Sequence, residues 1–136
     1  MMIRLLNDYY RIERWAVEND DTLFDITLLP EYRAYTGHFP DNPVSPGVCN
    51  IQMIKECAES VTNMRLFLNR IAKCRFSAVL TPQTASNLRL RLQLTEADTI
   101  SKVYQSGTGQ TYHAVALLFD DTTTYIDFKG DFNTVL

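Results

Sequence analysis

The sequence predicts an α+β domain in which one helix packs on an antiparallel sheet. Residues 46–63 repeat apolar side chains at intervals of three and four, the period of a helix that buries one face. Several other stretches alternate apolar and polar residues, which is typical of strands with one face in the core. At 136 residues the chain has the usual length of one domain, so we expect residues 1–136 to fold as a single unit. One helix among many strands favours the α+β class.

The predicted helix begins at the end of a proline-rich loop. Pro46 suits its first turn, where a missing N–H costs nothing, and Ser45 is a natural N-cap. The helix should therefore start at or just after Ser45 and lie along the sheet. The apolar stripe expected to contact the sheet consists of Val48, Ile51, Ile54, Ala58 and Val61.

Two stretches show the strand period most clearly. They are "IAKCRFSAVL" (residues 71–80) and the leucine-rich "NLRLRLQLT" (residues 87–95). The connector "TPQTASN" has turn chemistry, and if these strands pair antiparallel, their basic residues share one outer face. The faces expected in the core consist of Ala72, Cys74, Phe76, Ala78 and Leu80 in the first strand, and Leu88, Leu90, Leu92 and Leu94 in the second.

Further strands are expected before and after these elements. The glycine-containing break "SGTG" (106–109) is expected to join two of them as a hairpin. His113 falls inside a predicted strand among apolar residues, which favours a histidine that is hydrogen-bonded within the sheet. The further strands are predicted at residues 9–18, 22–29, 101–106, 111–119 and 124–129.

The composition excludes several classes of protein. No apolar stretch approaches the roughly 18–20 residues of a membrane span, and the N-terminus has no signal-peptide pattern, so we expect a cytoplasmic protein that does not enter a membrane. A net charge of −3 argues against nucleic acid as a partner. The three cysteines, Cys49, Cys57 and Cys74, contain no CxxC pair, which argues against a disulfide framework and against a zinc site.

The loop before the helix has the features of a rigid functional loop. In "YTGHFPDNPVSPGV" (residues 35–48), three prolines fix backbone angles around His38 and before Gly47. Gly47 stands at a helix start, where backbone N–H groups are unpaired and the helix dipole favours negative charge. A histidine next to such a helix start is typical of a site in which the histidine acts as general base and the helix N–H groups bind an oxyanion. A structural histidine is the alternative.

The same residues resemble a known signature. "GHFPDNPVSPGV" (37–48) is similar to the loop of the hotdog-fold 3-hydroxyacyl-(acyl carrier protein) dehydratases of the FabZ/FabA type, and "CRFSAVLTPQTASNLRLRLQL" (74–94) is similar to their strand–turn–strand pair. The resemblance implies a hotdog fold, in which an antiparallel sheet of five to seven strands wraps around one long central helix. It also implies a homodimer, with higher assembly open, that acts in fatty-acid or polyketide-type lipid biosynthesis.

The resemblance assigns roles to individual residues. His38 matches the histidine that removes the α-proton of a 3-hydroxyacyl thioester, and Gly47 matches the glycine whose N–H holds the thioester carbonyl. No metal or other cofactor is implied, because the phosphopantetheine arm arrives with the substrate. The neighbouring residues expected to contact substrate are Pro46, Val48 and Asn50.

One position departs from the family pattern. The second catalytic residue of the family is an acid on the central helix, contributed by the partner subunit, and Gln52 stands at that position. A glutamine can hydrogen-bond a hydroxyl but cannot donate a proton at useful pH. Three functions stay open: a slower or differently tuned dehydratase, a hotdog thioesterase, and a non-catalytic protein that binds an acyl chain or its carrier. Glu56, one turn further, could reach the site or serve as an interface or solvent contact.

The basic residues are unevenly distributed along the chain. The stretch from Ser60 to Thr95 contains six of them and no acid. Two interpretations fit this pattern, a solvated strand face or a docking surface for an acidic acyl carrier protein. The six residues are Arg65, Arg70, Lys73, Arg75, Arg89 and Arg91.

Overall fold

The computed structural model describes residues 4–32, 45–82, 87–97 and 109–135. These residues form one helix and six strands, which confirms the predicted α+β class. The strands are β1 (Tyr10–Glu18), β2 (Asp21–Leu28), β3 (Leu66–Phe76), β4 (Leu88–Glu96), β5 (Thr111–Phe119) and β6 (Thr124–Thr134), and the helix is α2 (Gly47–Thr62).

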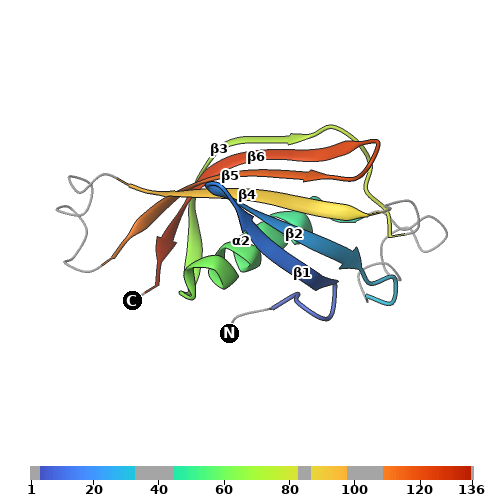
Figure 1. Cartoon of the computed structure of the whole chain (residues 1–136), viewed down its shortest axis with the longest axis horizontal. Helices are drawn as coiled ribbons and strands as arrows, with labels where there is room; N and C mark the ends of the chain where they lie inside the picture. Colours follow the sequence, from blue (N-terminus) through green and yellow to red (C-terminus); the bar gives the residue numbers. More distant parts are fainter. Residues whose placement is uncertain (1–3, 33–44, 83–86, 98–108, 136) are drawn as a thin grey trace.

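The strands form one antiparallel sheet that curves over the helix. Their order is β1-β2-β4-β5-β6-β3, so β1 and β3 are its two edge strands. Figure 1 shows α2 lying under the concave side of this sheet. One helix enclosed by a six-stranded antiparallel sheet is the hotdog arrangement that the sequence resemblance implies.

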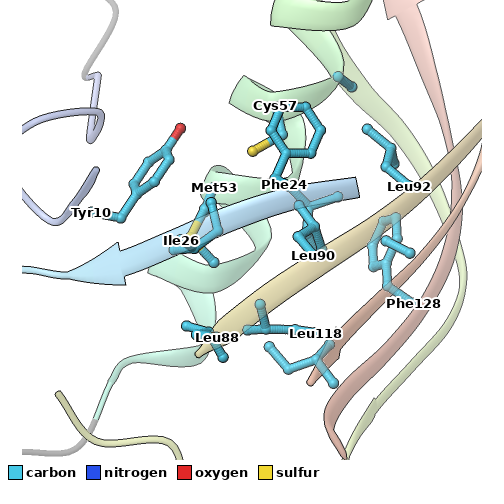
Figure 2. Close-up of a cluster of buried hydrophobic side chains, with 14 of the residues drawn as sticks. Tyr10, Phe24, Ile26, Met53, Cys57, Leu88, Leu90, Leu92, Leu118 and Phe128 are labelled. Carbon is cyan, nitrogen blue, oxygen red and sulfur yellow. The ribbon is translucent and has the colours of Figure 1, made fainter. Parts of the chain in front are cut away.

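The core fills the space between the helix and the central strands. In β4 the alternation predicted from the sequence is confirmed, because Leu88, Leu90 and Leu92 are buried. Figure 2 shows these leucines facing Met53 and Cys57 of the helix. Burying a leucine or phenylalanine side chain stabilises a fold by roughly 1.5–3 kcal/mol, so this layer holds α2 against the sheet.

Residues 71–80 do not pair with residues 87–95, so the condition for a shared basic face is not met. β3 pairs with β6, whereas β4 lies between β2 and β5, and two strands separate them. The period-two pattern identifies a strand's buried face but carries no information about its neighbour. The two strands therefore do not form a hairpin, and their basic residues do not lie side by side.

The expected core face of residues 71–80 is also wrong in part. Ala72 and Phe76 are exposed and Cys74 is half-buried. Beyond the end of the strand the expectation holds better, because Leu80 is buried in the core and Ala78 is half-buried against it. The pairing of β3 with β6 shifts register twice, between Leu68 and Arg70 and again between Ile71 and Lys73. Each such irregularity interrupts the alternation of faces, so a period counted along the sequence misassigns the residues beyond it.

The helix bounds agree with the prediction within one residue at each end, but its cap does not. Pro46 is the N-cap and no side chain caps the helix. Ser45 instead donates its backbone N–H to the carbonyl of Leu80, at 2.8 Å. Val48 is 75% exposed, which removes it from the predicted stripe. The buried face consists of Met53, Ile54, Cys57 and Ala58 together with three polar residues, Asn50, Glu56 and Glu59.

Some expectations concern residues outside the described part of the chain. His38 and the strand expected at residues 101–106 lie there, as does most of the hairpin break at 106–109. Within the described ranges, the helix is neither long nor apolar enough to cross a membrane.

Candidate active site

The start of α2 provides the backbone donors of the candidate site. Pro46 has extended backbone angles, φ −65° and ψ 137°, and its carbonyl accepts the N–H groups of Cys49 and Asn50 at 3.1 and 3.2 Å. The N–H groups of Gly47 and Val48 precede these first intrahelical bonds, and helix geometry directs them outward along the axis. This end of the helix carries a partial positive charge, so it favours an oxyanion.

Phe76 lies directly against this helix start. A β-carbon at Gly47 would stand 2.9 Å from Cζ of the Phe76 ring, closer than real β-carbons approach other atoms, and 3.2 Å from Cε1. Glycine at this position therefore allows the ring to lie against the backbone. The Phe76 side chain remains 53% exposed. An apolar, half-exposed ring thus adjoins Gly47, whose N–H the resemblance assigns to the thioester carbonyl.

Gln52, the residue at the position of the family's acid, is half-buried and held by Glu56. Its Nε2 donates a hydrogen bond to Glu56 Oε2 at 2.9 Å, across one helical turn. Glu56 itself is only 1% exposed. The two side chains therefore form one hydrogen-bonded unit, of which only Gln52 reaches toward the surface.

The Glu56 carboxylate also binds the N-terminal segment of the chain. Oε2 accepts the backbone N–H of Leu5 at 2.8 Å, and Oε1 accepts the N–H of Leu6 and the hydroxyl of Tyr10, both at 3.0 Å. The expectation of a solvent contact for Glu56 is wrong, because its carboxylate is enclosed by donors from its own chain. A buried carboxylate is tolerated when hydrogen bonds of this kind replace its water shell.

The groups packed beside Glu56 do not act as bases. Burial raises the pKa of the Tyr10 hydroxyl above its usual range, and the neighbouring Cys57 and Glu56 raise it further, so Tyr10 stays a proton donor. Burial likewise raises the pKa of the Cys57 thiol. The pKa of Cys49, in the first turn of the helix, is also raised by burial despite a hydrogen bond from Tyr32. A position in the first helical turn alone would favour the thiolate, but here desolvation prevails.

Asn50 points into the protein interior. It is buried, and its Oδ1 accepts a hydrogen bond from the hydroxyl of Tyr9. The Tyr9 ring in turn meets Tyr32 edge to face, with centroids 5.3 Å apart. This bond gives Asn50 a place in the packing beneath the helix start, and its contact with substrate stays a prediction.

The roles of Pro46, Gly47, Val48 and Gln52 in catalysis or substrate binding stay predictions as well. The structure places the first three at the exposed start of α2, and Gln52 further along it. His38 lies outside the described residues. Within the described ranges, no group of three or more histidine, cysteine or acidic residues could hold a metal ion.

Four of the six basic residues, Arg70, Lys73, Arg89 and Arg91, meet acids from β2, β6 or the turn after β5. The acid-free stretch of sequence therefore does not form an unpaired basic surface at these positions. Exposed ion pairs of this type contribute little stability, typically about 0–1 kcal/mol each, but they reduce the field that a partner meets. The pairs are Arg70–Asp131 at 3.1 Å, Lys73–Asp127 at 2.8 Å, Arg89–Asp121 and Arg91–Asp21 at 3.5 Å.

One hollow on the surface of the described residues lies away from the start of α2. It has a volume of about 470 Å³ and is lined by residues of β1, β2 and β4 and their connections, including Glu13, Asp25 and Arg89. No residue of the helix lines it. The charged residues on its walls are paired, Arg14 with Asp25 and Arg89 with Asp121, so the helix start remains the better candidate for chemistry.

Two features of the site could not be anticipated from the sequence. Phe76 reaches Gly47 only because β3 ends beside the helix start, and the partners of Glu56 lie about 50 residues earlier in the chain. One signal was available for the second feature. Glu56 and Glu59 flank Cys57 and Ala58 on an otherwise apolar face, and acids at such positions indicate buried partners.

Comparisons with known proteins agree with the observed fold and with the family that the sequence resembles. The model of the family described as ApeI-like, ApeI dehydratase, matches residues 14–115. The 3-hydroxyacyl-[acyl-carrier-protein] dehydratase FabZ of Caldanaerobacter subterraneus subsp. tengcongensis is 32% identical over 81 residues, which cover 51% of this chain and 57% of that protein. The dehydratase heterocomplex ApeI:P from Xenorhabdus doucetiae has a similar fold, with a TM-score of 0.58 and 19% identity over 89% of this chain and 95% of that chain.

Proposed function

This chain belongs to the ApeI-like family of dehydratases, and from that membership we propose that it removes water from a 3-hydroxyacyl thioester to leave the enoyl thioester. The proposal is supported most directly by the start of α2, where the outward N–H of Gly47 is followed on the same helix by a hydrogen-bonding side chain at Gln52. The substrate is expected on an acyl carrier protein, in a fatty-acid or polyketide-type pathway.

The proposed steps use groups of the chain itself. His38 takes the α-proton of the substrate, and the electron pair moves toward the thioester carbonyl, whose oxygen accepts the Gly47 N–H. The C–O bond at carbon 3 then breaks, and the hydroxyl leaves as water with the proton returned by His38. Gln52 supplies no proton in this scheme. It hydrogen-bonds the substrate hydroxyl and so fixes the leaving group.

A second copy of the chain completes the proposed site. Gly47 and Gln52 are five residues apart, so they project about 140° apart around the helix axis and face different sides. Such a pair serves one site more easily when each residue comes from a different protomer. The edge strand β3 offers a surface for pairing two copies, since Phe67, Ile71 and Phe76 on it are exposed. We therefore propose a homodimer.

A non-catalytic role in binding an acyl chain or its carrier is the second candidate function. It is favoured by the state of the carboxylate that Gln52 binds, that of Glu56, which is enclosed by donors from its own chain. Without a proton donor at this position, a general acid contribution of typically 10²–10⁴-fold in rate is lost. The fold would then hold the ligand without converting it.

One incubation separates the candidates. The full chain is mixed with a 3-hydroxyacyl thioester, and enoyl absorbance and free thiol are followed together. Dehydration predicts enoyl formation without thiol release, and His38→Ala should abolish it. Thiol release would instead indicate hydrolysis, and silence in both signals with retained ligand binding would indicate the binding role; either outcome contradicts the dehydratase proposal.

A further inference from the structure

The Glu56 carboxylate determines which way the Gln52 amide points. All four of its described hydrogen-bond partners are donors: the N–H groups of Leu5 and Leu6, the hydroxyl of Tyr10 and Nε2 of Gln52. An ionised carboxylate has only acceptor atoms. The end of the Gln52 amide that faces Glu56 must therefore be the NH₂ group, whichever way an isolated glutamine would turn.

This fixed direction has a consequence for the other end of the amide. With Nε2 turned to Glu56, the atom on the other branch of the amide is Oε1, which only accepts hydrogen bonds. Gln52 is half-buried whereas Glu56 is fully buried, so the Gln52 amide is the part of this pair that can meet a ligand. A ligand group that contacts Oε1 must then be a donor, such as a hydroxyl.

We propose that Glu56 is a positioning residue that makes Gln52 select a 3-hydroxyacyl over a 3-oxoacyl ligand. The inference rests on the proposed function, because it places the substrate's third carbon at Gln52. A 3-hydroxyl donates to Oε1, whereas a 3-oxo group brings an acceptor against an acceptor and leaves both without a hydrogen bond. Leaving such a pair unsatisfied typically reduces affinity by about tenfold.

A substitution at Glu56 should reverse the direction of the amide. In Glu56→Gln the new side chain has its own NH₂ group, which can donate to Oε1 of Gln52 once that amide turns over. Gln52 would then present Nε2, a donor, and the 3-oxo ligand should bind as well as the 3-hydroxy ligand or better. The shape of the side chain is retained, so the change acts on hydrogen-bond polarity more than on packing.

Glu59 provides the matched control. It lies three residues further on the same helix, is also buried, and accepts the backbone N–H of Leu66 at 2.8 Å. Among the described hydrogen bonds it has none to Gln52. Glu59→Gln should lower stability in the same manner as Glu56→Gln, but it should leave the preference between the two ligands unchanged.

The test measures binding rather than turnover. The probes are the 3-hydroxyhexanoyl and 3-oxohexanoyl amides of pantetheine, in which an amide replaces the reactive thioester, and calorimetry gives the ratio of their dissociation constants. The parent chain and Glu59→Gln should favour the hydroxy probe by about tenfold, whereas Glu56→Gln should lose or reverse the preference. An unchanged preference in Glu56→Gln, or a parent chain that binds both probes equally, would overturn the inference.

Gln52→Met keeps the test decisive if Glu56→Gln does not fold. Removing the amide should bring the preference close to one while Glu56 and its N-terminal partners stay in place. A preference that survives in Gln52→Met, or that Glu56→Gln still changes in the Gln52→Met background, would show that Glu56 does not act through Gln52. A parent chain that binds neither probe would instead contradict the proposed function itself.

Discussion

The ring of Phe76, at the end of β3, occupies the space into which any side chain at Gly47 would grow, with Cζ 2.9 Å from the position of such a β-carbon. This contact joins an edge strand of the sheet to the first residue of the helix. The proposed oxyanion donor and the exposed apolar end of β3 therefore form one local unit, and a change in either should affect the other.

Gly47→Ala should disturb this unit without unfolding the protein. The Phe76 ring is the end of a flexible, half-exposed side chain, so it can move aside, and we expect a loss of stability of about 1 kcal/mol. The kcat/KM for a 3-hydroxyacyl thioester should fall by more, about tenfold, because the new methyl group lies beside the carbonyl-binding N–H. In a Phe76→Leu background the stability cost should shrink. An equal cost in both backgrounds, measured by denaturant unfolding, would contradict the contact.

Gly130→Ala should be far more damaging than Gly47→Ala. Gly130 lies in β6, and a β-carbon there would stand 2.5 Å from the carbonyl oxygen of Arg70 in β3. That oxygen belongs to the backbone of the paired strand and cannot swing away as a ring does. We expect a loss of about 3 kcal/mol or more in the free energy of unfolding. Denaturation midpoints that fall equally for the two glycine substitutions would refute this ranking.

The stability of the sheet should depend on the ionisation of Asp131. Burial raises the pKa of this carboxyl, but hydrogen bonds from His113 and Arg70 outweigh it and lower the pKa below its usual value. A carboxyl whose pKa is lower in the folded chain stabilises the fold above its unfolded pKa, near 4, and this contribution is lost as pH falls through the folded value. Asp131→Asn should cost about 1–2 kcal/mol at pH 6. The difference from the parent should narrow toward pH 2 in urea unfolding, and a difference that stays constant would assign Asp131 a role in packing alone.

The arginines of β3 and β4 should differ in their value for docking an acidic carrier protein. Arg89 forms an ion pair with Asp121, whereas Arg75 is exposed and makes no salt bridge among the described residues. Arg75→Glu should therefore raise the KM for a carrier-linked substrate several-fold more than Arg89→Glu does, because an unpaired cation contributes more to long-range attraction. Neither change should alter the KM for a small thioester mimic. Equal effects on both substrates would remove the docking hypothesis.

The local elements could be predicted from the sequence because their signals are local. The helix follows from its apolar period and from Pro46, and β4 follows from its alternating leucines; both are observed close to the predicted bounds. The family could be predicted from the loop around His38, and the match to residues 14–115 confirms it. The partner of β3 could not, since the pattern of a strand specifies a face and not a neighbour.

The candidate site could be predicted only in outline for a similar reason. The sequence shows Gln52 as a departure from the family pattern at a known position. The group that orients it, Glu56, is itself held by contacts with residues about 50 positions earlier in the chain. The sequence alone does not distinguish a helix carboxylate that faces water from one that accepts a buried N–H group. The period-two alternation of residues 71–80 predicts Phe76 in the core, whereas the register shifts in β3 place its ring against the helix start.

The three polar side chains on the buried face of α2 also determine how the helix is seated. An apolar stripe alone allows a helix to rotate or slide on the apolar face of a sheet. Asn50, Glu56 and Glu59, in contrast, each accept hydrogen bonds from donors at one fixed place in the chain. Together they set the rotational and axial position of the helix. A shortened chain that began after Tyr10 would therefore leave a buried carboxylate facing no donors from residues 5–10, and we expect it to fold poorly although it would retain every residue of the helix and almost the whole sheet.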